Sequence, residues 1–316
     1  LESLIGTDGG VHFAPMEAAS AVISRAALTV GAERTFPPPP PWPPQGAPRR
    51  ADYVPRHERD GRSFVFTLDG MLPARVWQHV LSNGSTGYIA TECGSGCMWF
   101  ENAREMRITA PPADVNAVIG NEALWCDTGG ERISLFAAGD FRRCRVCYAP
   151  GYASWEKELG ARRVKTTAFI PADTDARVFI IEGAAGLRLN WAMKPVMGAA
   201  DAKAVRIEAR GSALVCSNPE SYLPGAEAVA VCSLPCEASC DYAPPTAVIT
   251  VLADDMTVLA CGCGGEDELR ALCTPKAAFE ALDRVRGGWS AFLRRLELSS
   301  GAEAFDAYMN TWAVYQ

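Results

Sequence analysis

The chain has 316 residues, of which 48% are hydrophobic, and its formal net charge is −7 at pH 7. A chain of this size and composition can bury one large core or two smaller ones. The acidic balance offers no positive surface to nucleic-acid phosphates, and no run of eighteen apolar residues is present to span a membrane. We therefore expect neither a nucleic-acid nor a membrane partner and, since no signal-peptide pattern is visible, a cytoplasmic protein.

The first sixty residues are predicted to form an arm that precedes the main domain. Residues 11–32 have the spacing of one short amphipathic helix, and the proline-rich run 36–45 is typical of a semi-rigid polyproline II spacer. We assign residues 1–60 to this N-terminal helix and proline-rich arm. Because the chain begins with Leu1 instead of Met, we expect it to be a piece of a longer protein.

Residues 61–264 carry the pattern of a β domain. Short runs rich in branched and aromatic residues are separated by Gly, Pro, Asp and Asn clusters. The clearest of these runs are 63–67, 132–136, 177–181, 213–216 and 247–252. They do not alternate with long helical patterns, which disfavours a parallel α/β sheet. The sequence predicts a mainly β fold, built as a large antiparallel sandwich.

After residue 264 the pattern becomes helical. Residues 266–272 and 275–296 have helical spacing, and the second run places an apolar stripe on one side, with a Gly287–Gly288 pair that is expected to kink or interrupt it. A third run, 302–315, places apolar residues on one face and reaches Gln316 without a Gly or Pro cap, as if the chain were cut inside a helix. The expected stripes are Phe279, Leu282, Val285, Trp289, Phe292 and Leu296 in the second run, and Phe305, Met309, Trp312 and Ala313 in the third. We assign residues 265–300 to a helical linker and 301–316 to a further helix.

The twelve cysteines do not form an evident disulfide or metal framework. A disulfide framework is typical of small secreted domains, whereas this chain is large and apolar, so reduced thiols are expected. Cys144 and Cys147 have zinc-like spacing but lie in a predicted strand, where residues three apart face opposite sides. We therefore expect buried thiols that act as small hydrophobic side chains, and no metal site.

Among the histidines, only His79 falls inside the predicted β domain. A sandwich enzyme that works like an aldose mutarotase needs a general acid and a general base that converge on a sugar, and histidine and glutamate usually serve. A packed or surface histidine is the favoured interpretation of His79. The candidate carboxylates are interpreted as solvated surface charges. They are Glu92, Glu101, Glu105, Asp114, Glu156 and Glu158.

The segment 94–109 concentrates aromatic rings and hydrogen-bond donors. Trp99, Asn102, Arg104 and Arg107 are the candidate contact residues, because rings stack on sugars and Arg and Asn bind hydroxyl groups. The same side chains anchor interfaces between domains, and that interpretation is given more weight. If the segment is extended, Asn102 and Arg104 share one face, which we expect to be turned toward the helical part.

Several segments, in order from about residue 61 to 316, share a recognisable pattern. They are 73–77 with 81–88, 91–96 with Trp99, Asn102–Glu105 and Ile108-Thr109, Gly151-Tyr152 and Glu156 with 167–173, and 305–316. Together these segments resemble those of glycoside hydrolase family 94. This family includes cellobiose and chitobiose phosphorylases and the phosphorylase-like part of cyclic β-1,2-glucan synthases. Cys97-Met98 and Ala110–Asp114 depart from its usual pattern.

The resemblance implies a galactose-mutarotase-like β-supersandwich, a helical linker and then an (α/α)6 barrel whose first helix is 301–316. It implies a parent enzyme that performs inverting phosphorolysis or synthesis of β-linked gluco-oligosaccharides, a glycosyltransferase-type hexosyl transfer. In the family the general-acid aspartate and the phosphate-binding residues belong to the barrel. No catalytic residue is therefore assigned here, and this piece alone is expected to be inactive.

The implied co-substrate is inorganic phosphate, and no other cofactor and no metal are expected. The implied partners are a β-linked oligosaccharide, the chain's own helical barrel and a second copy in a homodimer. Two rival functions remain open. One is a stand-alone carbohydrate-binding or assembly module without catalytic activity, and the other is a mutarotase-like enzyme in its own right.

Overall fold

The computed structural model describes residues 49–50, 56–59, 62–94, 96–111, 121–137, 142–199, 204–242 and 245–315. The chain divides into two units, Leu1–Phe36 and Pro37–Gln316, and every described residue belongs to the second. The predicted helix 11–32 and the proline-rich run 36–45 lie outside the described residues, so they stay predictions.

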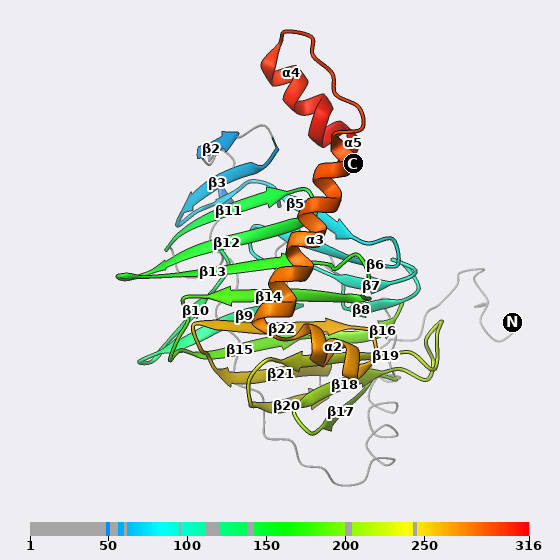
Figure 1. The fold of residues 1–316 in the computed structure, drawn as a ribbon. Helices are drawn as coiled ribbons and strands as arrows, with labels where there is room; N and C mark the ends of the chain where they lie inside the picture. Colours follow the sequence, from blue (N-terminus) through cyan, green and yellow to red (C-terminus); the bar gives the residue numbers. More distant parts are fainter. Residues whose placement is uncertain are drawn as a thin grey trace, which may run out of the picture. The chain divides into compact units, whose positions relative to one another are not determined.

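The second unit is built mainly from antiparallel strands, and the largest sheet has ten of them (Figure 1). Each described pair in this sheet is antiparallel, which confirms the predicted fold class. In sheet order the strands are β17 (Arg206–Arg210), β18 (Ala213–Ser217), β19 (Glu227–Cys232), β22 (Met256–Gly262), β14 (Ala176–Glu182), β13 (Arg162–Phe169), β12 (Tyr152–Leu159), β11 (Arg143–Ala149), β3 (Phe64–Asp69) and β2 (Arg56–Arg59).

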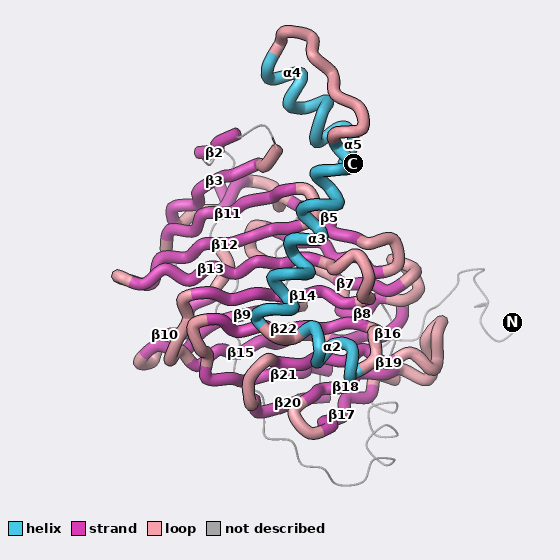
Figure 2. Tube along the Cα trace, in the orientation of Figure 1, coloured by secondary structure: helices cyan, strands magenta, loops and turns pink. Residues whose placement is uncertain are grey.

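Among the described residues, two five-stranded antiparallel sheets and one short parallel pair complete the strands (Figure 2). The first sheet is β10 (Glu131–Ser134), β9 (Glu122–Thr128), β15 (Arg188–Met193), β21 (Pro245–Leu252) and β20 (Cys236–Tyr242). The second is β16 (Pro195–Gly198), β8 (Arg107–Thr109), β7 (Met98–Phe100), β6 (Thr86–Thr91) and β5 (Gln78–Ser82). The parallel pair is β1 (Arg49–Arg50) with β4 (Leu72–Pro73).

One face of the ten-stranded sheet packs on both five-stranded sheets. The ring of Phe179 in β14 lies 6.0 Å from Trp191 in β15 and 6.3 Å from Tyr88 in β6, measured between ring centroids. All three side chains are buried. Because side chains alternate along a strand, the neighbours Val178 and Ile180 point to the opposite face of the sheet.

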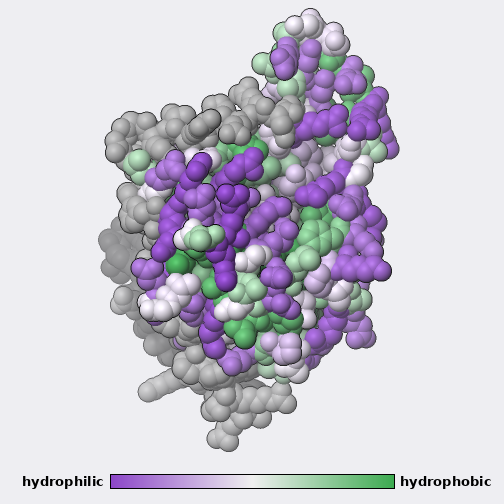
Figure 3. All heavy atoms as spheres, turned by 60° about the vertical axis from the view of Figure 1, so that its left-hand side comes forward, coloured by the Kyte–Doolittle hydropathy of each residue, from purple (hydrophilic) through white to green (hydrophobic). Residues whose placement is uncertain are grey.

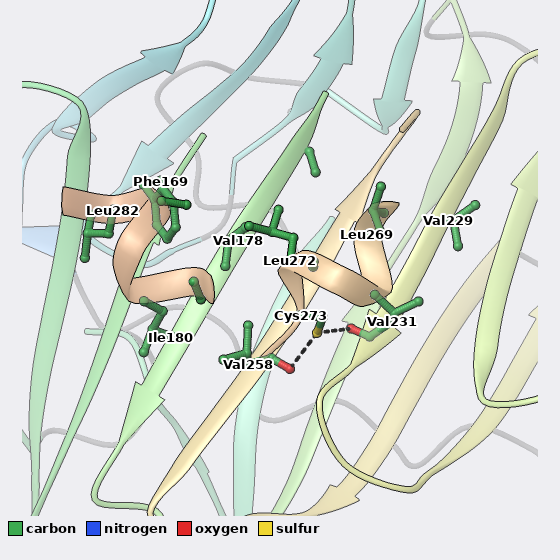
Figure 4. Packing of buried hydrophobic residues seen from close by; sticks show 14 of the residues in the cluster. Phe169, Val178, Ile180, Val229, Val231, Val258, Leu269, Leu272, Cys273 and Leu282 are labelled. Atoms are coloured by element: carbon green, nitrogen blue, oxygen red, sulfur yellow. Dashed lines mark hydrogen bonds between the residues drawn. The ribbon is translucent and has the colours of Figure 1, made fainter. Parts of the chain in front are cut away.

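That opposite face is covered by two helices, α2 (Glu266–Leu272) and α3 (Pro275–Leu293). Their apolar residues pack against β14, β22, β19 and β18 in one cluster (Figure 4). The N-terminus of α3 is fixed locally, since the Thr274 side chain accepts a hydrogen bond from the Ala277 N–H and Pro275 occupies the first turn. Both predicted helices are confirmed, but α3 runs without interruption through Gly287 and Gly288 and ends at Leu293.

The part of this face that the two helices do not cover carries charged residues. Arg145, Glu156, Lys165 and Glu182 lie opposite one another on β11, β12, β13 and β14. Opposite charges that face each other across strands stabilise a sheet and keep its face soluble. The adjoining face of the molecule is likewise dominated by hydrophilic side chains (Figure 3). The helices therefore cover the part of the sheet that is apolar.

The last helical run consists of α4 (Glu303–Ala307), a π-helical turn η2 (Tyr308–Trp312) and α5 (Ala313–Tyr315). The predicted helix is confirmed, whereas its predicted apolar face is wrong in part. Phe305 is 50% exposed and Ala313 is exposed, while Thr311 is buried. A π turn adds a residue to the turn, so it shifts the side chains that follow out of the 3.6-residue register. Phe292 and Leu296, which belong to the apolar stripe predicted for residues 275–296, are likewise exposed.

No helix among the described residues has both the length and the apolar character needed to cross a membrane.

Candidate functional site

A cleft of about 760 Å³ lies between the sandwich and the C-terminal helices. Strands β3, β5 and β11 contribute one wall, and α3 with the 303–315 run contributes the other. Aromatic side chains dominate its lining, with Ser63, Gln78 and Ser82 as polar members. The aromatic members are Phe64, Tyr148, Trp289, Tyr308, Trp312 and Tyr315.

His79 lies at the inner side of this cleft, because the alternation in β5 buries it together with Leu81. Its ring stacks with those of Tyr148 and Tyr315, each at 5.1 Å between centroids. Its Nε2 lies 2.8 Å from the carbonyl oxygen of Ala149. A carbonyl can only accept, so Nε2 carries the proton of the neutral imidazole.

Burial governs the ionisation of these three rings. It lowers the pKa of His79 to about 4 and raises the pKa of Tyr315 to about 12. It also raises the pKa of Tyr148 well above its usual value. All three groups are therefore uncharged near pH 7. This arrangement fits the interpretation of His79 as a packed residue, held by a backbone carbonyl between aromatic rings.

Tyr315 joins the last helix to three separate parts of the sandwich and its helices. Its hydroxyl donates to the Val80 carbonyl at 2.6 Å, and accepts from the Gly151 N–H at 3.4 Å. Its ring lies 4.6 Å from that of Trp289 on α3. We call His79, Tyr148, Trp289 and Tyr315, together with Gly151, the aromatic joint. Sequence periodicity did not identify Tyr315, because the expected stripe assumed a regular α-helix and the π turn over Tyr308–Trp312 shifts the side chains that follow it.

The four predicted contact residues lie elsewhere, at the β7–β8 end of the second five-stranded sheet. Trp99 is half-buried against Gly87, and Arg107 is half-buried with its Nε donating to the Ala103 carbonyl at 2.8 Å. Arg104 is 88% exposed and lies 3.2 Å from Glu105. The structure brings these residues together in one segment, and a sugar or interdomain contact by them stays a prediction.

The connection between β7 and β8 is a turn, so the condition under which Asn102 and Arg104 would share one face, an extended segment, is not met. The Asn102 Oδ1 atom accepts hydrogen bonds from the backbone N–H groups of Arg104 and Glu105, at 2.9 and 3.0 Å. An asparagine that binds the backbone two residues further on favours a turn over a strand. Asn102 therefore shapes the loop that presents Arg104.

A buried ion pair that sequence reasoning missed lies between the layers of the sandwich. Glu122 at the start of β9 and Arg177 on β14 are fully buried, and Arg177 Nη1 donates to Glu122 Oε2 at 2.6 Å. Trp191 Nε1 donates to the other carboxylate oxygen at 2.8 Å. The Arg177 guanidinium also lies 4.2 Å from the Phe179 ring centroid. Glu92, expected to be solvated, is buried as well, and it accepts from the Trp77 N–H at 2.9 Å.

The two cysteines with zinc-like spacing, Cys144 and Cys147, lie on one strand, as predicted. Cys144 is fully buried on β11, whereas Cys147 is half-buried and points to the opposite face. Within the part of the chain that the structure describes, no group of three or more His, Cys, Asp or Glu side chains is placed to hold a metal ion. Nine of the twelve cysteines are buried, as expected for thiols that fill a core.

Comparison with solved structures finds, among other matches, two at low identity. One is an Escherichia coli K12 protein assigned as an aldose 1-epimerase, with 11% identity, a TM-score of 0.38, and coverage of 59% of this chain and 98% of that chain. The other, from the human microbiome, is assigned as a kojibiose phosphorylase, with 10% identity and a TM-score of 0.39. That match covers 80% of this chain but spans only 38% of the phosphorylase.

Comparison of sequences is more specific. No curated protein sequence matches the chain. Residues 62–182, however, match the model of the family described as "Glycosyl hydrolase 94, supersandwich domain". These residues run from the start of β3 to the end of β14 and supply His79, Tyr148 and Gly151 of the aromatic joint. Over residues 62–182 this chain is therefore similar to the glycosyl hydrolase 94 supersandwich domain.

Proposed function

We propose that this chain is the non-catalytic, N-terminal part of a carbohydrate-active glycoside phosphorylase. The observation that carries the proposal is the match of residues 62–182 to the glycosyl hydrolase 94 supersandwich domain. The aromatic joint supports it, because Tyr315 holds the last helix on the sandwich by hydrogen bonds to β5 and to the β11–β12 turn. In this proposal the sandwich positions the helices that lead into a catalytic (α/α)6 barrel.

The reaction of the parent enzyme would be inverting phosphorolysis of a β-linked gluco-oligosaccharide, or its reverse. Inorganic phosphate attacks the anomeric carbon, the glycosidic bond breaks, and an aspartate of the barrel protonates the leaving sugar oxygen. Phosphate is the co-substrate, and the proposal requires no other cofactor. The sandwich contributes rigidity and shapes the mouth of the active site, in a cytoplasmic enzyme that forms a homodimer.

The turn after β7 is our candidate for direct contact with a sugar or with another domain. Trp99 supplies a half-exposed ring, and Arg104 and Arg107 supply guanidinium donors close by. Titration of the chain with a β-linked gluco-oligosaccharide, followed by tryptophan fluorescence, tests the sugar role. Arg104→Ala should weaken the binding if the turn contacts the sugar, and equal affinities would remove the turn from the site.

An assay of the chain for phosphorolysis tests the non-catalytic assignment. Incubation with β-linked gluco-oligosaccharides and phosphate should release no more sugar 1-phosphate than a buffer control. Release well above that control would overturn the proposal, since it would place catalytic residues in this part.

The gene sequence that follows codon 316 tests the parent enzyme. A helical barrel with an acid aspartate is the expected result. A stop codon, together with oligosaccharide binding by the chain, would instead favour the stand-alone carbohydrate-binding module.

A further inference from the structure

The cleft beside the aromatic joint is lined by uncharged side chains. Among the described residues that line it, none is Asp, Glu, Lys or Arg, and its one histidine, His79, is neutral near pH 7 because burial lowers its pKa to about 4. A phosphate, carboxylate or ammonium group would lose hydration there and gain no opposite charge. The cleft therefore suits an uncharged molecule, and its volume of about 760 Å³ lies in the range of small-molecule sites, about 300–1,000 Å³.

The room in the cleft comes from two alanines on the last helical run. Ala304, Tyr308 and Trp312 are four residues apart, so they lie on one side of the run, and Ala307 adjoins them in the lining. Ala304 and Ala307 contribute only a methyl group each. The bulky, exposed Phe305 of the same run does not line the cleft. The side of the run that faces the sandwich therefore keeps an open space between its aromatic side chains.

Two aromatic rings on this side of the run differ in how they are held. Tyr308 is 54% exposed although it lines the cleft, and among the described residues its ring stacks on no other ring and its hydroxyl makes no hydrogen bond. Trp312 is half-buried, and its ring is held edge-on at 6.0 Å from the rings of His79 and Tyr315. An accessible ring next to a fixed one offers a platform on which a ligand can stack.

The strand wall of the cleft supplies hydrogen-bonding groups. Gln78 and Ser82 alternate with the buried His79 along β5, so both occupy exposed positions, and both line the cleft. The Gln78 amide can donate and accept. The Ser82 hydroxyl donates to the Thr86 carbonyl at 2.9 Å and accepts from the Gly84 N–H at 3.1 Å, which leaves it one lone pair. A purely apolar ligand would cover these groups without offering them a partner, at a cost in free energy.

We propose that this cleft is a saccharide-binding site, in which an uncharged pyranose unit stacks on Tyr308 and Trp312 and directs hydroxyl groups to Gln78 and Ser82. A sugar combines an apolar C–H face for the rings with a hydroxyl edge for the amide and the hydroxyl. The site is separate from the turn after β7, and a sugar bound in it contacts both β5 and the last helical run. The choice of a β-linked gluco-oligosaccharide rests on the proposed function, whereas the uncharged character of the ligand rests on the lining alone.

The test titrates the full chain with cellotriose in a calorimeter and compares hydrogen–deuterium exchange of the free and the saturated chain. Binding should be saturable, and exchange should slow in residues 78–82 and 303–315. Inorganic phosphate is the control probe and should slow exchange in neither segment, since the lining holds no cation. Three results would overturn the proposal: no saturable binding at millimolar cellotriose, protection of residues 99–107 in place of the cleft segments, or protection of the cleft segments by phosphate.

Variants locate the sugar. Tyr308→Ala removes the accessible ring and should weaken cellotriose binding by roughly fivefold. Ala307→Phe fills the space and should prevent binding, and if it disturbs the fold, Tyr308→Ala decides. Phe305→Ala is the matched control, because Phe305 is 50% exposed on the same run but lies outside the lining, and it should leave the affinity unchanged. An unchanged affinity for Tyr308→Ala, or an equal loss for Phe305→Ala, contradicts the site.

The outcome is distinguishable from that of the proposed function. Failure to bind cellotriose in a chain whose gene continues into a helical barrel contradicts the cleft alone. Binding in the cleft, with a stop codon after codon 316, supports the site and contradicts the parent phosphorylase alone.

Discussion

The imidazole of His79 stacks on the phenol ring of Tyr315, with ring centroids 5.1 Å apart and planes 21° from parallel. The first residue belongs to β5 of the sandwich and the second to α5, the last helix of the chain. The Tyr315 hydroxyl also donates to the carbonyl of Val80, the residue next to His79. The contact between a strand near the start of the sandwich and the final helical turn is thus both stacked and hydrogen-bonded.

The buried state of His79 predicts a pH-dependent loss of stability. Its pKa is about 4 in the folded chain and 6.5 for an unperturbed histidine, so between these pH values the unfolded chain binds the proton and the folded chain does not. The free energy of unfolding should therefore be unaffected above about pH 6.5 and should fall by on the order of 3 kcal/mol as pH drops through the folded pKa. Urea denaturation at a series of pH values measures it.

The control for this effect is His79→Gln, which keeps a donor for the Ala149 carbonyl but does not titrate. Carboxylates titrate equally in both proteins, so the difference between the two pH profiles isolates His79. Parallel profiles between about pH 4 and pH 6.5 would show that His79 is not buried in the neutral form.

Gly151 tests how closely α3 approaches the sandwich. It has a φ of +86°, and a Cβ atom there would overlap the side chains of Val285 and Trp289. Gly160 also has a positive φ, +65°, but a Cβ atom there meets nothing within 4 Å. Gly160→Ala should cost about 1 kcal/mol of unfolding free energy from backbone strain, and Gly151→Ala a further ~1–3 kcal/mol from overpacking. Equal losses in chemical denaturation would mean that α3 does not pack against Gly151.

The buried ion pair predicts a large difference between two glutamate substitutions. Glu122→Gln leaves the Arg177 guanidinium buried without its anion, which should cost roughly 3–5 kcal/mol. Glu227→Gln removes one partner of an exposed pair, since Arg210 and Glu227 are 44% and 41% exposed, and should cost at most about 1 kcal/mol. Urea midpoints of the two variants compare them. A small effect for Glu122→Gln would show that water reaches Arg177.

Much of the architecture follows from local pattern. Branched residues such as those of Ala176–Glu182 fit a buried, pleated sheet, and the three acidic residues that open Glu266–Leu272 favour the start of a helix. These signals lie within a few residues of each other, so a single sequence contains them. The strands at 213–217 and 245–252 were predictable for the same reason.

The joint and the ion pair depend on contacts between distant segments. Glu122 and Arg177 each look like an ordinary surface charge until the two sheets face each other. Tyr315 was missed because the π turn breaks the helical period, and such a turn has no signature in the residues themselves. Asn102 lies in the turn between β7 and β8, and its side chain favours that turn because it accepts hydrogen bonds from backbone N–H groups further along the chain.

Hydrogen–deuterium exchange of residues 303–315 tests most directly whether Tyr315 holds the last helix on the sandwich. Tyr315→Ala removes the hydrogen bonds to Val80 and from Gly151 and the ring contacts with His79 and Trp289, together on the order of 1–3 kcal/mol. Exchange in this helix should therefore become at least several-fold faster while the sandwich strands stay protected. The matched control is Tyr308→Ala in the same run, where the side chain is 54% exposed and little change is expected. If Tyr315→Ala leaves the exchange of residues 303–315 at the unmodified rate, or if Tyr308→Ala accelerates it equally, the aromatic joint does not hold the helix.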